Sequence, residues 1–464
     1  MRSFCLVAFL TIASALSAQR TVGLMTNTAG SSQGYVLFAP LNSTSTYLVD
    51  KCGKLVHQWS SAYRPAQSAY LLPNGQLLRS GNDTTNKIIP ANGGHLELLD
   101  WDSKRIWHYT ISNATERQHH DICPLPNGNI LVLAYSKRSR EEAQAEGRDP
   151  ATAGNGVLGE KIIELKPIGR DSAKIVWQWE VWHHLVQERD STLPNYGKVK
   201  QQPRLFHLNY THAMGEDWLH FNSIAYNAAL DQVMLSSHHL NEFYIIDHST
   251  STAQAASHKG GRYGHGGDIL YRWGNPAAYN MGTPAEKQLF GQHYPHWIEK
   301  GKPGAGKILV FNNGLNRPGE PCSSVEIIEP PLDAKGNYLL ADEQAFGPAG
   351  SSWKYTAPIP TQFFSKNISG AQRLANGHTL ICSGSTGRFF EIDGSQKIVW
   401  EYICPVGFEP VPQGTRSERA TSKTNGQVFR CTFYEPSYPA FKGRKLLPGA
   451  PIEINPGTYP CLME

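Results

Sequence analysis

The chain has 464 residues, of which 40% are hydrophobic and 18% are charged, and its net charge is +4. This small charge excludes a basic nucleic-acid-binding surface and an acidic tail as dominant features. The 43 Gly, 30 Pro and 11 Trp residues are typical of short strands joined by tight turns, and they exclude a coiled coil or a disordered chain.

The N-terminus has the three parts of a secretory signal: Arg2, an apolar run over residues 4–16, and small residues up to Ala18. We expect residues 1–18 to be removed, with cleavage after Ala15 as the alternative, and residues 19–464 to be exported to a periplasm or secreted. The run is too short to span a bilayer, and no other stretch is long enough, so no membrane span is predicted.

Removal of the signal takes Cys5 and leaves an odd number of cysteines. Late cysteines such as Cys404, Cys431 and Cys461 are candidates to attach the C-terminal tail by a disulfide in an oxidising compartment. The sequence does not decide the pairing.

One phrase recurs along the chain: an apolar strand, an Asn-Gly turn and a second strand. The copies are residues 70–78, 123–131 and 372–380. Asn-Gly fits the two positive-φ positions of a type I′ turn, so each copy predicts a β-hairpin. A second recurring phrase consists of a strand, a turn and a second strand that ends in Trp. Its copies end at Trp59, Trp107, Trp177, Trp273 and Trp400, and a looser copy has Trp353.

These repeats predict an all-β fold, a β-propeller with six four-stranded blades. We expect a single domain with blades over about residues 34–402 and a C-terminal extension over 403–464. The strand at 34–38 is expected to close the last blade. The stretches 136–156, 183–217 and 249–267 are predicted as loop insertions. A large β-sandwich is the alternative, although sandwiches seldom reuse one turn phrase.

Polar residues precede the first strand of several repeats: His119 and His120 in one, His220 in another, His293 in a third, and Ser369 in a fourth. Because the first strand of a propeller blade is innermost, these side chains are expected to meet at one end of the central channel.

Residues near these positions extend the predicted site. Strand alternation puts Asn222 on the same face as His220. Asn313 ends a strand, and Arg317 follows it as a cation near the histidines.

Other histidines are expected to be structural, as hydrogen-bonding residues at blade junctions or in loops. His238, His239, His183 and His184 fall in this group, and His378 lies on an Asn-Gly turn at the far end of its strand.

A zinc site is an alternative use of the histidines, either His207 and His212 with His220, or His293 with His296. No HExxH or CxxC pattern supports it, and histidines beside an arginine suit an anion better than a cation. We therefore expect no metal and no cofactor.

Five segments resemble the bacterial arylsulfate sulfotransferase (arylsulfotransferase) family, over nearly the whole mature chain. They are residues 217–223 (DWLHFNS), 291–293 (GQH), 310–317 (VFNNGLNR), 368–371 (ISGA) and 400–402 (WEY). The resemblance implies an exported six-bladed propeller that moves a sulfuryl group from a phenolic sulfate ester to another phenol. It also implies that 3′-phosphoadenylyl sulfate (PAPS) is not used and that a histidine carries the sulfuryl group.

Carried over by position, His220, His293 and Arg317 match the family's active-site residues. The family's nucleophilic histidine follows the arginine, and the histidine that follows Arg317 here is His378. The nucleophile is therefore left open among His119, His120 and His293.

In this interpretation Arg317 binds two sulfonyl oxygens, one neutral imidazole attacks sulfur, and His220, held by Asn222, protonates the leaving phenolate. His119, His120, Asn222 and Asn313 are expected to bind substrate. The expected partners are an aryl sulfate donor and a phenolic acceptor, not nucleic acid. A non-catalytic exported propeller that binds a protein, a glycan or an anion is the alternative function. A hydrolase is a third hypothesis, but the sequence lacks the Cys/Ser-x-Pro-x-Arg motif of sulfatases.

Overall fold

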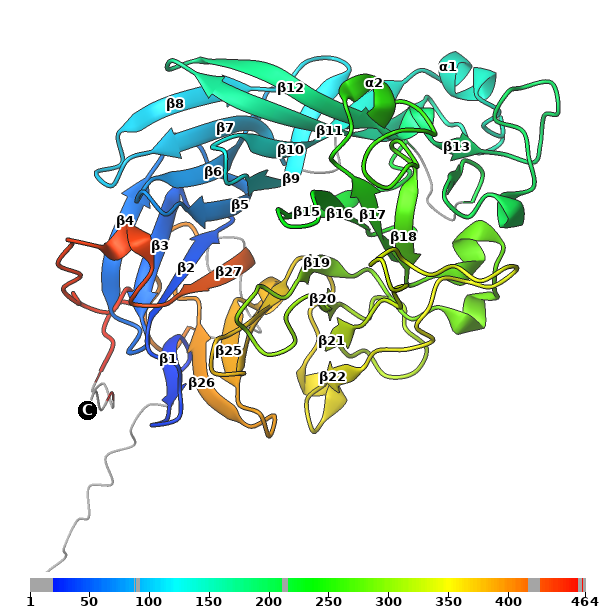
Figure 1. The fold of residues 1–464 in the computed structure, drawn as a ribbon. Coiled ribbons are helices and arrows are strands. Elements are labelled where there is room, and N and C mark those ends of the chain that lie inside the picture. The colour runs from blue at the N-terminus through cyan, green and yellow to red at the C-terminus, as the bar shows by residue number, and fades with distance from the viewer. Residues whose placement is uncertain are drawn as a thin grey trace, which may run out of the picture.

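Four-stranded antiparallel sheets are arranged radially around one central axis, so the protein is a six-bladed β-propeller, as predicted (Figure 1). The computed structural model describes residues 20–86, 88, 92–210, 216–415, 426–457 and 461. The predicted signal at residues 1–18 and one zinc candidate, His212, lie outside the described residues.

Each blade runs from an innermost strand at the axis to an outermost strand at the rim. In that order, blade 1 is β27 (Val428–Tyr434), β2 (Tyr35–Pro40), β3 (Ser45–Asp50) and β4 (Leu55–Ser60); blade 2 is β5 (Pro65–Leu71), β6 (Leu77–Asn82), β7 (Gly94–Leu99) and β8 (Arg105–Thr110); blade 3 is β9 (Glu116–Pro124), β10 (Ile130–Arg138), β11 (Val157–Ile168) and β12 (Ser172–Glu180). Blade 4 is β15 (Phe221–Asn227), β16 (Gln232–Ser237), β17 (Glu242–Asp247) and β18 (Ile269–Trp273); blade 5 is β19 (His293–Trp297), β20 (Ile308–Asn312), β21 (Ser324–Ile328) and β22 (Trp353–Tyr355); blade 6 is β23 (Gly370–Arg373), β24 (Thr379–Ser383), β25 (Arg388–Ile392) and β26 (Ile398–Ile403).

The ring closes differently from the prediction. Residues 34–38 do not complete the last blade: β2 pairs with β3 and, on its other side, with β27 from the C-terminal region. The extension expected over 403–464 therefore supplies the innermost strand of blade 1. In addition, β1 (Gly23–Asn27) pairs with β26 as an outer fifth strand of blade 6. Both chain ends thus take part in the propeller, which leaves fewer unpaired strand edges.

The Asn-Gly phrases form hairpins as predicted, but not with type I′ turns. In the first copy the N–H of Gly75 donates to the carbonyl of Leu72, and Gly75 has φ +87°. Asn74 is not among the positive-φ residues. Pro73 favours a type I turn because its ring fixes φ near −65°, and Gly75 then takes the left-handed position of a bulge. Gly128 and Gly377 repeat this geometry.

The core is divided among the blade interfaces, with one large hydrophobic cluster between each pair of neighbouring blades. The repeated tryptophans explain part of this arrangement. The indole N–H of Trp400 donates to the carbonyl of Lys51 in blade 1, and that of Trp273 donates to Pro348 in blade 5. These hydrogen bonds from the end of an outer strand join each of the two blades to the next one.

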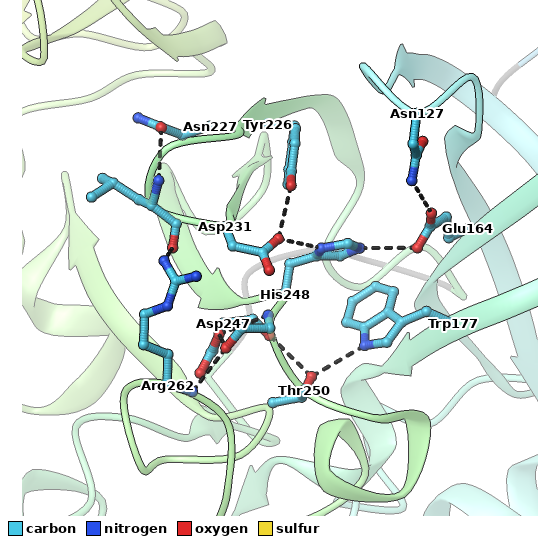
Figure 2. Close-up of polar contacts among 12 residues, drawn as sticks. Asn127, Glu164, Trp177, Tyr226, Asn227, Asp231, Asp247, His248, Thr250 and Arg262 are labelled. Atoms are coloured by element: carbon cyan, nitrogen blue, oxygen red, sulfur yellow. Dashed lines mark hydrogen bonds and ion pairs between the residues drawn. The ribbon is translucent and has the colours of Figure 1, made fainter.

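A polar network joins blades 3 and 4 beside one of these tryptophans (Figure 2). His248 bridges two carboxylates, with Nδ1 at 2.7 Å from Asp231 and Nε2 at 3.2 Å from Glu164. Trp177 of blade 3 donates to the hydroxyl of Thr250. Burial lowers the pKa of His248, but hydrogen bonds to Glu164 and Asp231 raise it more, so the net pKa is above the ordinary value.

The predicted insertions are largely loops with small elements. They carry α1 (Arg140–Ala145), a two-stranded parallel sheet of β13 (Leu185–Val186) and β14 (Phe206–His207), and α2 (Thr252–Ala255). A disulfide joins Cys52 of blade 1 to Cys461, whereas Cys404 and Cys431 are free thiols. None of the helices in the described part of the chain is both long enough and apolar enough to cross a bilayer.

Candidate active site

Irregular backbone marks the point where several innermost strands begin at the channel. His120, His220, Tyr294 and Ser369 have φ of +48°, +52°, +53° and +93°, values that non-glycine residues rarely adopt. In blades 3, 4 and 5 the pairing register shifts at or beside these residues. Such β-bulges redirect side chains and occur often beside active sites.

The bulges bring histidines from three blades together at one end of the channel. The ring of His220 lies 4.7 Å from that of His120 and 5.3 Å from that of His238, measured between centroids. The ring of His238 in turn lies 5.7 Å from that of His293. The structure therefore places the predicted residues His120, His220 and His293 around one point.

The expectation that His238 and His239 are structural residues without convergent partners is wrong. Both lie in the turn between β16 and β17, and the backbone N–H of His238 donates to the carbonyl of His220. Because β15 and β16 are antiparallel, the end of β16 lies beside the start of β15, where Phe221 pairs with Ser237. This turn therefore belongs to the same end of the channel as His220.

His220 is held by Asp217, not by Asn222 as predicted. Nδ1 of His220 lies 2.6 Å from Oδ2 of Asp217, and Nδ1 of His239 donates to the Asp217 carbonyl at 3.0 Å. Burial lowers the pKa of His220, but the hydrogen bond and charge of Asp217, with the charge of Glu160, raise it above the ordinary value. Among the clustered histidines, His220 is therefore the one whose surroundings favour the protonated form.

Asn222 has a different role, because a β-bulge between positions 221 and 223 interrupts the alternation of side chains between the two faces of the strand. Its amide donates to the carbonyl of Gln292 at 2.7 Å, which joins blade 4 to blade 5, and its Oδ1 is buried without a hydrogen-bond partner. The side chain is fully buried, and its hydrogen bond helps to hold blade 4 against blade 5.

His119 lies behind His120 in a buried hydrogen-bonded chain. Its Nδ1 is 2.9 Å from Nδ1 of His120, and its Nε2 is 3.0 Å from Oε2 of Glu160 on β11. Its ring stacks on Tyr135 with centroids 3.7 Å apart. Burial lowers the pKa of His119 far below its usual value and raises the pKa of Glu160 far above its own, so both groups are favoured in their neutral forms.

His293 has both ring nitrogens occupied. Nδ1 donates to Oδ1 of Asn313 at 2.8 Å, and Nε2 accepts the backbone N–H of Ile368 at 3.2 Å. The side-chain NH₂ group of Asn313 in turn donates to the backbone carbonyls of Ser365 and Ile368. Burial lowers the pKa of His293 to about 3, so it is a neutral residue that fixes the position of blade 6 against blade 5.

Arg317 lies on the loop after β20, next to the site but paired within its own blade. Its guanidinium donates to Ser324 at 3.1 Å and lies 3.9 Å from Glu326. Among the described residues, its hydrogen bonds and ion pairs join it to blade 5 and not to the histidines.

A second arginine, Arg430 on β27, occupies the channel below the histidines. It forms an ion pair with Asp121 at 2.7 Å, donates to the hydroxyl of Tyr70 at 2.8 Å, and lies 3.5 Å from the ring centroid of Tyr294. Residues of blades 1, 2, 3 and 5 thus meet across the channel. This cluster lies between the histidine end and a cavity of about 870 Å³ at the opposite mouth, which the Asn-Gly turns surround.

A smaller cavity of about 420 Å³ opens beside the histidines. It is lined by His238, His239, Lys287, Leu315, Asn316, Tyr210 and the amides Asn241 and Asn275. A lysine, amides and an aromatic side chain suit a small aromatic anion. This cavity adjoins the histidine cluster through His238 and His239, although other cavities are larger.

Within the part of the chain that the structure describes, two sets of side chains have ligand atoms close enough for a metal ion: Asp217 with His220 and His239, and His184 with His258 and Asp268. Neither is a set predicted from the sequence. Of the zinc ligands predicted from the sequence, His207 packs against Tyr210, and both ring nitrogens of His293 form the hydrogen bonds described above. In the second set both nitrogens of His184 already bond, to Asp268 and to the Ala255 carbonyl.

A family model described as Arylsulfotransferase (ASST) matches residues 27–435. The chain belongs to the arylsulfotransferase family. No curated protein matches it significantly.

Among solved structures, the chain is similar to a protein of unknown function from Bacteroides caccae, with 12% identity over 86% of this chain and 98% of the other, and a TM-score of 0.43. A putative 6-phosphogluconolactonase from Bacteroides fragilis has 10% identity over 88% and 99% of the two chains, with a TM-score of 0.41. A virginiamycin B lyase from Staphylococcus aureus has 12% identity over 82% and 84%, with a TM-score of 0.38.

In this member of the arylsulfotransferase family, the histidine after Arg317 is not part of the cluster. His378 follows the turn that leads into β24, at the opposite end of blade 6 from Ser369, and its Nδ1 bonds to Glu391 at 2.6 Å. At the channel end, blade 6 presents Ile368 and Ser369 instead. The predicted placement of His378 is confirmed, so this chain lacks a histidine at that point of blade 6.

Besides His238 and His239, the roles of Glu160, Asp217 and Arg430 were missed. Asp217 lies three residues before His220, a spacing that allows a local hydrogen bond. Glu160 and Arg430 carried no signal, because Glu160 lies on β11, two strands away from His119 in the same blade, and Arg430 lies beyond the predicted blades.

Proposed function

We propose that the protein transfers a sulfuryl group from a phenolic sulfate ester to a second phenol without PAPS, through a sulfated histidine. The observation that carries this proposal is the pair His120 and His220, whose rings lie 4.7 Å apart and whose Nδ1 atoms are held by His119 and Asp217 respectively. Family membership supports the substrate class.

The reaction needs an electron pair to attack sulfur and an acid to protonate the departing phenolate. Burial and the neighbouring histidines lower the pKa of His120 far below its usual value, which keeps it neutral. His220, with its raised pKa, is able to donate a proton near neutral pH. Lys287 and Arg317 lie at or next to the cavity, and we expect them to bind the sulfonate oxygens.

Export to an oxidising compartment is part of the proposal. Residues 1–18 have the pattern of a secretory signal, and the Cys52–Cys461 disulfide supports it because such bonds persist mainly outside the cytosol. Outside the cell a nucleotide sulfate is not supplied, whereas a diffusible ester can serve as the donor.

Anion binding without turnover is the second candidate function. The observation that favours it is the position of His378, 16% exposed at the far end of blade 6, where it cannot act as the family's late nucleophile.

A two-substrate assay separates the candidates. The mature chain is mixed with 4-methylumbelliferyl sulfate, with and without an added phenol, and both phenol release and sulfated acceptor are measured. We expect acceptor-dependent release that falls by roughly 10²–10⁴-fold in His220→Gln. Saturable binding of the donor with no release from the folded protein would select the anion-binding function.

A further inference from the structure

We infer that His120 of blade 3 carries the sulfuryl group, and that Glu160, acting through His119, sets the tautomer in which Nε2 of His120 attacks sulfur. This inference rests on the proposed function. It places the nucleophile on blade 3, before Arg317 in sequence, whereas the resemblance implied a histidine after that arginine.

The hydrogen bonds of the other histidines exclude most of them. Both nitrogens of His293 and both nitrogens of His119 are occupied. Nδ1 of His220 is held by the Asp217 carboxylate, which also raises the pKa of His220, so this imidazole is suited to donate a proton and not to attack. Nδ1 of His239 bonds to the Asp217 carbonyl, and its Nε2 lies 3.7 Å from the same residue's carboxylate.

His120 differs because one of its nitrogens is held and the other is available. Nδ1 bonds to His119, while Nε2 has no hydrogen-bond partner among the residues that the structure describes. His238 is the remaining competitor, but its Nδ1 is buried without a partner, so nothing fixes its tautomer. A nucleophilic imidazole needs a second group that holds the proton on the other nitrogen.

The chain from Glu160 to His120 permits two proton arrangements. When Glu160 is protonated it donates to Nε2 of His119, His119 donates from Nδ1 to His120, and the proton of His120 is on Nε2. When Glu160 is a carboxylate, His119 donates to it from Nε2, His120 donates from Nδ1 to His119, and Nε2 of His120 has a free lone pair. Burial raises the pKa of Glu160 and so favours the first arrangement at rest, and the second, reactive arrangement forms when Glu160 loses that proton. Oε1 of Glu160 accepts the backbone N–H of Phe221 in both arrangements, which keeps the carboxyl group in place.

In the transfer, the lone pair on Nε2 of His120 forms a bond to sulfur while the bond from sulfur to the aryl oxygen breaks. The electron pair of the broken bond stays on the phenolate, which takes the proton from Nε2 of His220. The positive charge that appears on His120 is relieved as protons move from its Nδ1 to His119 and from His119 to Glu160. In the second half the acceptor phenol returns a proton to His220, its oxygen bonds to sulfur, and the electron pair of the broken sulfur–nitrogen bond returns to Nε2 of His120. At the same time the relay protons move back, from Glu160 to Nε2 of His119 and from Nδ1 of His119 to Nδ1 of His120, which restores the starting arrangement.

The variant Glu160→Gln tests the relay because it nearly preserves shape but reverses one hydrogen bond. Its amide oxygen accepts from Phe221, so its NH₂ group donates to Nε2 of His119 and locks the arrangement in which His120 has no lone pair. We expect kcat to fall by roughly 10³-fold, as when a catalytic imidazole elsewhere is held in the wrong tautomer. The KM for the donor should stay within about twofold, since the cavity is unchanged; a change in KM with no change in kcat would contradict the relay.

The matched control is Glu164→Gln on the same strand, β11. Glu164 is also buried and bonds to a histidine, but that histidine is His248 in the interface between blades 3 and 4. Transfer should be unchanged in this variant at neutral pH. Thermal unfolding of both variants separates loss of the relay from loss of the fold.

Mass spectrometry of the wild-type chain locates the sulfuryl group independently of any variant. The chain is mixed with 4-methylumbelliferyl sulfate without acceptor, quenched in alkali, digested, and its peptides are fragmented. We expect the added sulfuryl group on His120. Its presence on His238, His220 or a tyrosine would overturn the assignment while leaving the proposed function intact. A wild-type chain that releases no phenol with any acceptor would overturn the proposed function, and the assignment with it.

Discussion

The contact between Asp217 and His220 makes the substitution Asp217→Asn a sharp test of the acid. The asparagine retains an oxygen that accepts from Nδ1 of His220 but removes the negative charge 2.6 Å away. Replacing a charged hydrogen-bond partner by a neutral one costs about 1–1.5 kcal/mol, which corresponds to about one pKa unit. Because burial already lowers the pKa of His220, the variant's pKa should fall below the ordinary value, and most of the acid form is lost at pH 7.

The expected loss depends on the leaving group. A poor leaving group such as phenol needs the proton from His220, so we expect release from phenyl sulfate to fall by at least about tenfold at pH 7. The more acidic 4-nitrophenol departs as its anion, so its release should fall much less. Stopped-flow measurement of the first turnover with both donors gives this comparison directly.

Asp231→Asn is the matched control, because Asp231 makes the same kind of contact to Nδ1 of His248 at 2.7 Å, far from the cavity (Figure 2). It should leave both donors unaffected. Equal losses for the two donors in Asp217→Asn, or no loss in either, would refute the role of His220 as the acid.

Three further predictions follow from other contacts. His248 has a pKa raised in the folded state, so the stabilisation it provides is fully present below about pH 6.5 and is lost as pH rises through the folded pKa. Urea unfolding of His248→Gln should therefore show a deficit of about 1–3 kcal/mol at pH 5.5 that shrinks at pH 9, and a deficit that grows with pH would contradict this. Cys52→Ser should lower the free energy of unfolding by about 2–5 kcal/mol, and treatment with a reductant should lower the wild type's thermal midpoint towards that of the variant but leave the variant's unchanged. Transfer should be unaffected by EDTA, whereas Zn²⁺ should inhibit it by binding Asp217, His220 and His239, and activation by Zn²⁺ would contradict the metal-free mechanism.

The repeats carried enough information to predict the propeller and its number of blades, because each blade must bury its own strands and repeats the same turn and tryptophan. They did not reveal the closure, since β27 lies outside the recurring phrases and pairs with a strand almost 400 residues earlier in the chain. The turn type was mispredicted because the residue before Asn-Gly, such as Pro73, decides where the turn begins.

The histidines of the site were predictable from their phase, but their partners were not. His220 directly precedes β15 and His293 begins β19, as the phase predicted. His119 and His120 were expected ahead of their strand but lie in the middle of β9, where a bulge places them at the channel. Asn222 was assigned to His220 by strict alternation, and a bulge that no sequence pattern marks turned it towards Gln292. Glu160 reaches His119 across two strands of blade 3, so only the folded sheet shows that they are paired.

The most direct test of the histidine-carried transfer is a rapid-mixing experiment with donor alone. Excess 4-methylumbelliferyl sulfate is mixed with a known amount of the mature chain, and release of the fluorescent phenol is followed with no acceptor present. A covalent intermediate predicts a burst of about one phenol per chain, followed by a slow phase that an added phenol accelerates. Phenol release that requires the acceptor from the first turnover would contradict the two-step account.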